Sequence, residues 1–130
     1  MKIRLQPLLL ILSLLAPTVV LADVCEDINY IANGWNEMAN ALHNADLSQI
    51  TEAEAAEVDA AITEAYGATE AFAIVLETEG SADEVDLGGD LRYALVTLWN
   101  TQDGTLEDTV WAMDEVVDAL DNITDYCDQQ

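Results

Sequence analysis

Apolar residues recur at intervals of three and four along most of the chain, the spacing that places side chains on one face of an α-helix. The pattern is clearest over residues 24–44, where fours and threes alternate and predict a first helix with one buried face. The apolar positions of this helix are Val24, Ile28, Ile31, Trp35, Met38, Leu42 and Ala45.

The stretch 105–127 carries a second apolar stripe, and Cys127 continues its line. The stripe comprises Leu106, Val110, Met113, Val117 and Leu120. A row of acids on another face comprises Asp114, Asp118, Asp121 and Asp125. Because these acids lie away from the stripe, we expect their face to meet solvent or a partner.

An Ala-rich helix is predicted over residues 48–78, where Thr51 and Glu54 have the spacing of a capping box. Gly67 interrupts its centre and indicates a bend or a close helix contact, because glycine costs about 1 kcal/mol relative to alanine inside a helix. Its apolar positions are Val58, Ala61, Ile62, Ala65, Phe72, Val75 and Leu76.

The next helix is firmly predicted only over residues 90–100. Gly80 ends the helix before it, and Ser81 with Glu84 forms another capping-box pattern. The glycine pair at 88–89, however, weakens the first turns that would follow this cap. The inward positions are Leu91, Leu95 and Leu98.

Short turns at 46–48, 80–81 and 103–104 connect these segments, and no strand-like alternation is bounded by turns. Four helices with short connections predict an all-α, up-down-up-down four-helix bundle. An even number of antiparallel helices returns the chain to its starting end, so Cys25 and Cys127 can meet and form a disulfide. The competing topology has five helices, with a break at Gly67.

The first 22 residues have the features of a cleaved secretory signal peptide. Lys2 and Arg4 precede an apolar run at 8–15, and Ala22 stands before an acid. A retained membrane anchor is disfavoured because the run is short and Pro17 follows it. We therefore expect a single periplasmic or secreted domain over residues 23–130, without stable membrane insertion. An oxidising compartment favours the disulfide as a structural link.

Composition changes sharply beyond residue 22, because all 26 acids lie there with Arg92 as the only Lys or Arg. One base against 26 acids leaves a formal net charge of −25. Nucleic-acid binding is excluded, since phosphate contacts need basic side chains. Such a surface has two explanations: adaptation to salt, which screens like charges, or recognition of a basic protein, which the negative field steers toward it.

Enzymatic chemistry has little support, because His43 is the only histidine and both cysteines are assigned to a disulfide. We therefore expect a non-enzyme. Met38 and Met113 come level on the inward stripes, where core packing is favoured over soft-metal or haem ligation because no further ligands accompany them. Residues 83–90 and 100–107 combine acids with glycine but lack the EF-hand pattern. We predict no cofactor and no metal site.

Trp99 and Trp111 flank the turn at 103–104, and His43 is expected at the same end of the bundle. The tryptophans either seal the edge of the core or form an aromatic patch for a partner, which Tyr66 and Tyr93 would extend. The candidate partner-binding residues are His43, Trp99, Trp111, Asp114, Asp118, Asp121 and Asp125.

These features favour an exported, non-enzymatic acidic protein that acts by protein–protein binding, such as an inhibitor or immunity-type protein for a basic periplasmic partner. The alternative is a helical bundle that binds a small ligand or a cation such as calcium and has a salt-adapted surface. A ligand-binding bundle requires a cavity for its guest, whereas a protein-binding module requires a filled core and an exposed aromatic patch.

Overall fold

The computed structural model describes residues 24–129, and the predicted signal peptide, residues 1–22, lies outside this range. The described residues form four α-helices, α2 (Val24–His43), α3 (Glu52–Glu79), α4 (Ala82–Trp99) and α5 (Leu106–Asp128), with a short 3-10 turn, η2 (Leu47–Gln49), and no strand. None of these helices is long and apolar enough to cross a membrane.

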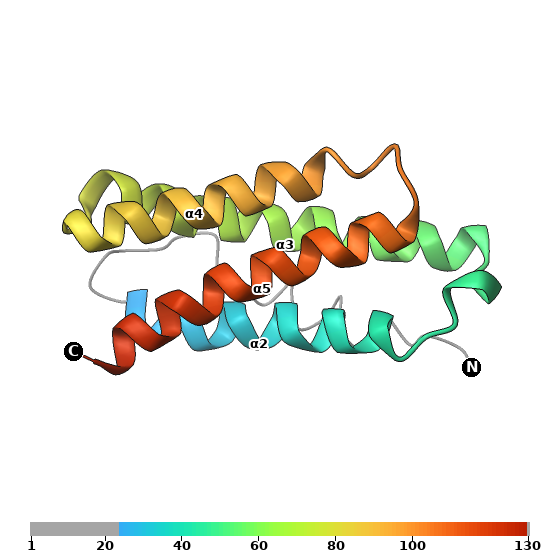
Figure 1. Cartoon of the computed structure of the whole chain (residues 1–130), viewed down its shortest axis with the longest axis horizontal. Helices are drawn as coiled ribbons and strands as arrows, with labels where there is room; N and C mark the ends of the chain where they lie inside the picture. The colour runs from blue at the N-terminus through green and yellow to red at the C-terminus, as the bar shows by residue number, and fades with distance from the viewer. Residues whose placement is uncertain (1–23, 130) are drawn as a thin grey trace.

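The four helices run alternately up and down and pack as a bundle, as predicted (Figure 1). α3 packs along α4, α4 along α5, and α5 along α2, whereas α2 and α3 come close at few places. The first and last helices are therefore neighbours, and the two ends of the bundle differ: one carries the disulfide and the other carries the α4–α5 connection.

Polar caps begin three of the helices. Thr51, Ser81 and Thr105 each accept a hydrogen bond from the backbone N–H three residues later, and the acid at that later position bonds back to the cap. These capping boxes satisfy N–H groups that a helix start leaves without partners. The pairs predicted at 51/54 and 81/84 are confirmed, and Asp108 completes a third.

Two predicted helix starts are wrong, and the competing five-helix topology is not found. α3 starts at Glu52 rather than at residue 48, because the preceding residues form η2, capped by the side chain of Asp46. α3 also continues unbroken past Gly67, so the five-helix topology is wrong. α4 starts at Ala82, well before residue 90, because its capping box fixes the first turn despite the glycines.

Gly88 lies buried where α4 passes close to α3. A Cβ atom added at this position would lie 2.8 Å from the Cβ of Leu76 and 2.9 Å from the backbone oxygen of Ala73. The glycine therefore permits the helices to approach, which offsets its weak helix propensity. Beside this contact Arg92 Nη1 lies 2.8 Å from Glu77 Oε2 and links the same two helices.

The core consists almost entirely of aliphatic and aromatic side chains from all four helices. Met38 and Met113 are both fully buried within it, as the core-packing interpretation predicted. In α5 the buried face is turned slightly from the predicted stripe, since Val116 is fully buried whereas Leu106 and Val117 are half-buried. The fully buried large side chains are Trp35, Phe72, Ile28, Met38, Leu42, Leu76, Leu91, Leu95, Leu98, Met113 and Leu120.

A polar link joins α2 to α3 inside this core. The indole Nε1 of Trp35 donates to Thr69 Oγ1 at 2.8 Å, and that hydroxyl donates to the Ala65 carbonyl at 2.7 Å. Both Trp35 and Thr69 are completely buried. The large indole thus bridges α2 and α3, whose backbones come close at few places, and its N–H group has a hydrogen-bond acceptor there.

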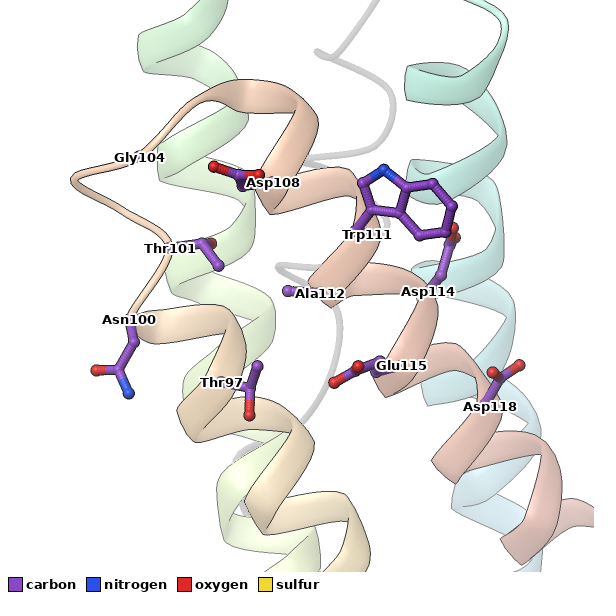
Figure 2. A pocket seen from close by; sticks show the side chains of 10 residues that line it. All are labelled: Thr97, Asn100, Thr101, Gly104, Asp108, Trp111, Ala112, Asp114, Glu115 and Asp118. Atoms are coloured by element: carbon purple, nitrogen blue, oxygen red, sulfur yellow. The ribbon is translucent and has the colours of Figure 1, made fainter.

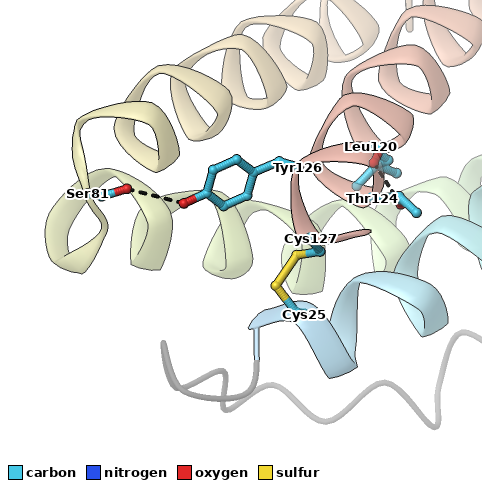
Figure 3. The surroundings of a disulfide bond; sticks show 6 residues. All are labelled: Cys25, Ser81, Leu120, Thr124, Tyr126 and Cys127. Atoms are coloured by element: carbon cyan, nitrogen blue, oxygen red, sulfur yellow. Dashed lines mark hydrogen bonds between the residues drawn. A yellow bond between two sulfur atoms is a disulfide. The ribbon is translucent and has the colours of Figure 1, made fainter. Parts of the chain in front are cut away.

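The disulfide between Cys25 and Cys127 is confirmed and joins the first turn of α2 to the last turn of α5 (Figure 3). The two cysteines are separated by 102 residues in sequence. At the same end, the Tyr126 hydroxyl lies 3.5 Å from Ser81 Oγ, the cap of α4. At this end of the bundle, α2 and α5 are therefore joined covalently, and Tyr126 of α5 also contacts the start of α4.

Gly88→Ala and Gly67→Ala should change stability in opposite directions. No atom lies within 4 Å of a Cβ added at Gly67, so alanine should raise the unfolding free energy, by up to about 1 kcal/mol. At Gly88 the added methyl group must push α3 and α4 apart, which should lower the unfolding free energy by about 1–3 kcal/mol. Urea unfolding measures both. If both variants changed the unfolding free energy in the same direction, the close approach of the helices at Gly88 would be contradicted.

Thr69→Val should destabilise the bundle by about 1–3 kcal/mol, because it leaves the buried Trp35 N–H without an acceptor. Thr63→Val is the matched control: Thr63 lies on the same helix, donates to the Asp59 carbonyl at 2.8 Å, and is exposed. Thermal unfolding should show a clear loss for the first variant and little change for the second. Similar losses would mean that the Trp35 contact contributes nothing specific.

Candidate partner-binding surface

Trp111 stands within an acidic face of α5, which we define as Trp111, Asp114, Glu115, Asp118, Asp121 and Asp125. Spacings of three and four bring these residues onto one side of the helix, opposite the buried stripe. Trp111 is 70% exposed, an unusual position for the largest apolar side chain. The acids predicted to share this side are all outside the core.

An open groove of about 610 Å³ runs beside Trp111 between the end of α4 and the start of α5 (Figure 2). Its α4 wall and the connecting loop present small polar groups, and its α5 wall presents Trp111 and carboxylates. The lining residues are Thr97, Asn100, Thr101, Gly104, Asp108, Trp111, Ala112, Asp114, Glu115 and Asp118. The groove thus combines one aromatic surface with many hydrogen-bond acceptors.

The four carboxylates of the groove differ in what they already contact. Asp108 bonds back to the Thr105 N–H in the α5 cap, and Asp114 pairs with His43. Within residues 24–129, Glu115 and Asp118 have no hydrogen-bond or ion-pair partner. These two are therefore available to bind a cationic or hydrogen-bond-donating group.

His43 and Asp114 are brought together from α2 and α5, at the end of the bundle where His43 was expected. The Nε2 atom of His43 lies 2.9 Å from each Asp114 oxygen, and the two side chains are 50% and 37% exposed. His43 is the last residue of α2. This contact ties α5 to α2 at the end opposite the disulfide.

Trp99 takes a different place from Trp111 and does not line the groove. It ends α4, is 46% exposed, and packs against Tyr66 of α3 with ring centroids 5.2 Å apart and planes tilted by 52°. Burial, followed by a hydrogen bond to Glu70, raises the pKa of Tyr66, so its hydroxyl keeps its proton. Trp99 therefore covers the edge of the core, while Trp111 remains open.

The last acids of the face, Asp121 and Asp125, lie toward the disulfide end and are exposed. Partial burial of the Asp121 carboxyl raises its pKa, and the charges of Asp118 and Asp125 raise it further. Ionised Asp121 thus opposes folding. No cation balances this row, because Arg92, the only Lys or Arg in the described range, is paired with Glu77.

No group of three or more His, Cys, Asp or Glu residues within 24–129 is arranged to hold a metal ion. Glu115, Asp108 and the polar α4 wall were not among the predicted site residues. Glu115 could have been found, because it lies four residues after Trp111 and three before Asp118. The α4 wall could not, because it requires knowing how α4 lies against α5.

Comparison with protein-family models, curated proteins and solved structures finds no match to this chain.

Asp121→Asn should stabilise the protein at pH 7 and low salt by a few tenths of a kcal/mol, because it removes repulsion with Asp118 and Asp125. A raised pKa in the folded state means that lowering the pH protonates Asp121 and relieves the same repulsion. The gain should shrink as pH falls through that pKa, and again in about 1 M salt. Thermal unfolding at several pH values and salt concentrations measures it.

Asp59→Asn is the control for this variant. Asp59 is exposed on α3 and has no acid three or four residues away, so its neutralisation should change stability little. An equal gain at both positions would show that only net charge matters.

Proposed function

We propose that this protein binds a basic protein partner through the acidic face of α5 and acts by that binding rather than by catalysis. The observation that carries the proposal is Trp111, 70% exposed among unpaired carboxylates beside a groove. Burying an exposed tryptophan contributes strongly to association, and tryptophan is enriched at the centres of protein interfaces.

Electrostatics supports a basic partner over a neutral one. The described residues carry a single Lys or Arg, and it is already paired, so the surface has no cations of its own to offer an acidic partner. A field of one sign speeds the approach of an oppositely charged protein and repels chains of like charge. Asp114 and Asp118 beside Trp111 would direct that approach to the groove.

The proposal places the protein outside the cytoplasm. The signal-like segment at 1–22 and the disulfide both favour an oxidising compartment. A small rigid bundle with a covalently fixed end suits an inhibitor or immunity-type protein, which covers the surface of a basic enzyme or toxin. Such a role requires a stable docking face and no chemistry of its own.

Affinity capture with the oxidised protein tests this function. The bait should retain a basic protein from the extracytoplasmic fraction of its host, and the complex should dissociate between about 0.1 and 0.5 M salt, because exposed charge pairs are screened. Trp111→Leu and the double variant Glu115→Gln/Asp118→Asn should each release that protein. Mass spectrometry identifies it.

Tyr30→Leu is the matched aromatic control, since Tyr30 is 64% exposed on α2 rather than on α5. Asp86→Asn/Asp90→Asn is the charge control, because both acids are exposed on α4 away from the groove lining. Both controls should keep the partner. Capture that is unchanged in the α5 variants, or lost equally in the controls, would reject the acidic face of α5 as the binding surface.

A further inference from the structure

We propose that the groove beside Trp111 binds an arginine side chain of the partner, with its guanidinium stacked on the indole and bonded to Glu115, in the negative field to which Asp118 adds. This inference rests on the proposed function and specifies its chemistry. It follows from three properties of the groove: the exposed indole, the two unpaired carboxylates, and an opposite wall that presents acceptors.

The indole of Trp111 is the first property. Its ring is open to solvent over most of its area and lies among acids rather than beside a cation of this chain. The face of an indole attracts cations, and surrounding carboxylates strengthen that attraction. A guanidinium gains more than an ammonium here, because it is planar, stacks on aromatic rings and loses less hydration.

The carboxylates are the second property. Glu115 and Asp118 follow Trp111 by one and two turns, and neither has a partner among residues 24–129. Figure 2 shows Glu115 pointing toward α4 and Asp118 pointing to the other side of α5. Glu115 is therefore the carboxylate that can bond to a guanidinium in the groove, while the charge of Asp118 adds to the negative field around the indole.

The α4 wall is the third property, because its hydroxyl protons are already used. Thr97 Oγ1 donates to the Tyr93 carbonyl at 3.0 Å, and Thr101 Oγ1 donates to the Leu98 carbonyl at 2.7 Å. Both hydroxyl protons are therefore turned to carbonyls of α4 rather than to the groove, and Thr101 Oγ1 also lies 3.3 Å from Thr109 Oγ1. These two threonines offer a guest acceptors only, which favours a donor over a carboxylate or a phosphate, and Asn100 in the same wall can both donate and accept.

No described residue of this chain can supply the arginine. Arg92 lies on the α3 side of α4, where it is 2.8 Å from Glu77 and not among the groove residues. A second copy would bring the same excess of acid to the interface. The arginine must therefore come from a different, basic chain.

Titration with short peptides tests the assignment. The oxidised protein is mixed with a Gly/Ser peptide that carries one arginine, and with matched peptides that carry lysine or citrulline. Binding is followed by NMR at the tryptophan indole N–H signals, with the Trp111 signal identified by its loss in Trp111→Leu. We expect the Trp111 signal to move with the arginine peptide, less with lysine, and not with citrulline.

Trp111→Leu should weaken arginine binding about two- to five-fold, followed at backbone signals, which is the range of an exposed cation–π contact. Tyr30→Leu should leave it unchanged. Glu115→Gln/Asp118→Asn should weaken binding more than Asp86→Asn/Asp90→Asn, which removes the same charge elsewhere on the surface. Circular dichroism confirms that each variant is folded.

Two results would overturn the arginine assignment: equal binding of the arginine and citrulline peptides, or an arginine affinity that Trp111→Leu does not change. Either result leaves the capture experiment to stand by itself, because a partner could still bind the acidic face of α5 by charge alone. If capture is also unaffected by the α5 variants, the proposed function fails as well.

Discussion

Burial of an uncharged core has to hold this bundle together, because the chain contains almost nothing that can neutralise its own surface. Beyond residue 22 there are 26 acids and one Lys or Arg, and that residue, Arg92, is already paired with Glu77. Partial burial of the Asp121 carboxyl, and after it the charges of Asp118 and Asp125, raise the pKa of Asp121, so its ionised form opposes folding. The core adds no further cost, because every buried side-chain nitrogen or oxygen in the described part has a hydrogen-bond partner.

The disulfide between Cys25 and Cys127 adds stability that offsets the repulsion between surface charges. It joins α2 to α5, the two ends of the domain, and closes 102 residues of sequence separation. The chain-entropy model assigns a link of this length about 4–5 kcal/mol, through the unfolded state rather than through new contacts. Because that contribution does not depend on salt, it persists where screening is weak and surface repulsion is strongest.

Local sequence predicted the parts of the fold that depend on local chemistry. The first helix, the capping boxes at Thr51 and Ser81, and the pairing of Cys25 with Cys127 follow from spacing and from helix parity. Gly88 was misjudged because a glycine signals either a weak helix or a close neighbour, and only the path of α3 decides which. In α5 the buried face is turned round the helix from the stripe, so Val116 rather than Val117 is fully buried, and that rotation is set by the packing of α5 against α2 and α4 rather than by spacing along the sequence.

In the candidate surface, too, some features follow from local sequence and others depend on how the helices pack. The sequence alone places Trp111 among acids, because residues three, four and seven positions apart share a helix face. It could not supply the groove, because the threonine wall comes from α4 and its orientation depends on tertiary packing. Nor could it separate Trp99, held by Tyr66, from Trp111, since both flank the same turn.

Binding and folding are coupled in a protein with this charge distribution. The acids that destabilise the folded state of the free protein are the same groups that the proposed function assigns to partner recognition. A basic partner brings to this face the counter-charges that the chain lacks, so it binds the folded state and relieves repulsion at the same time. Any ligand that prefers the folded state raises its stability in proportion to the logarithm of ligand concentration. If the proposed function holds, the repulsion along the acidic face of α5 is the cost, in the free protein, of charges that a basic partner balances in the complex.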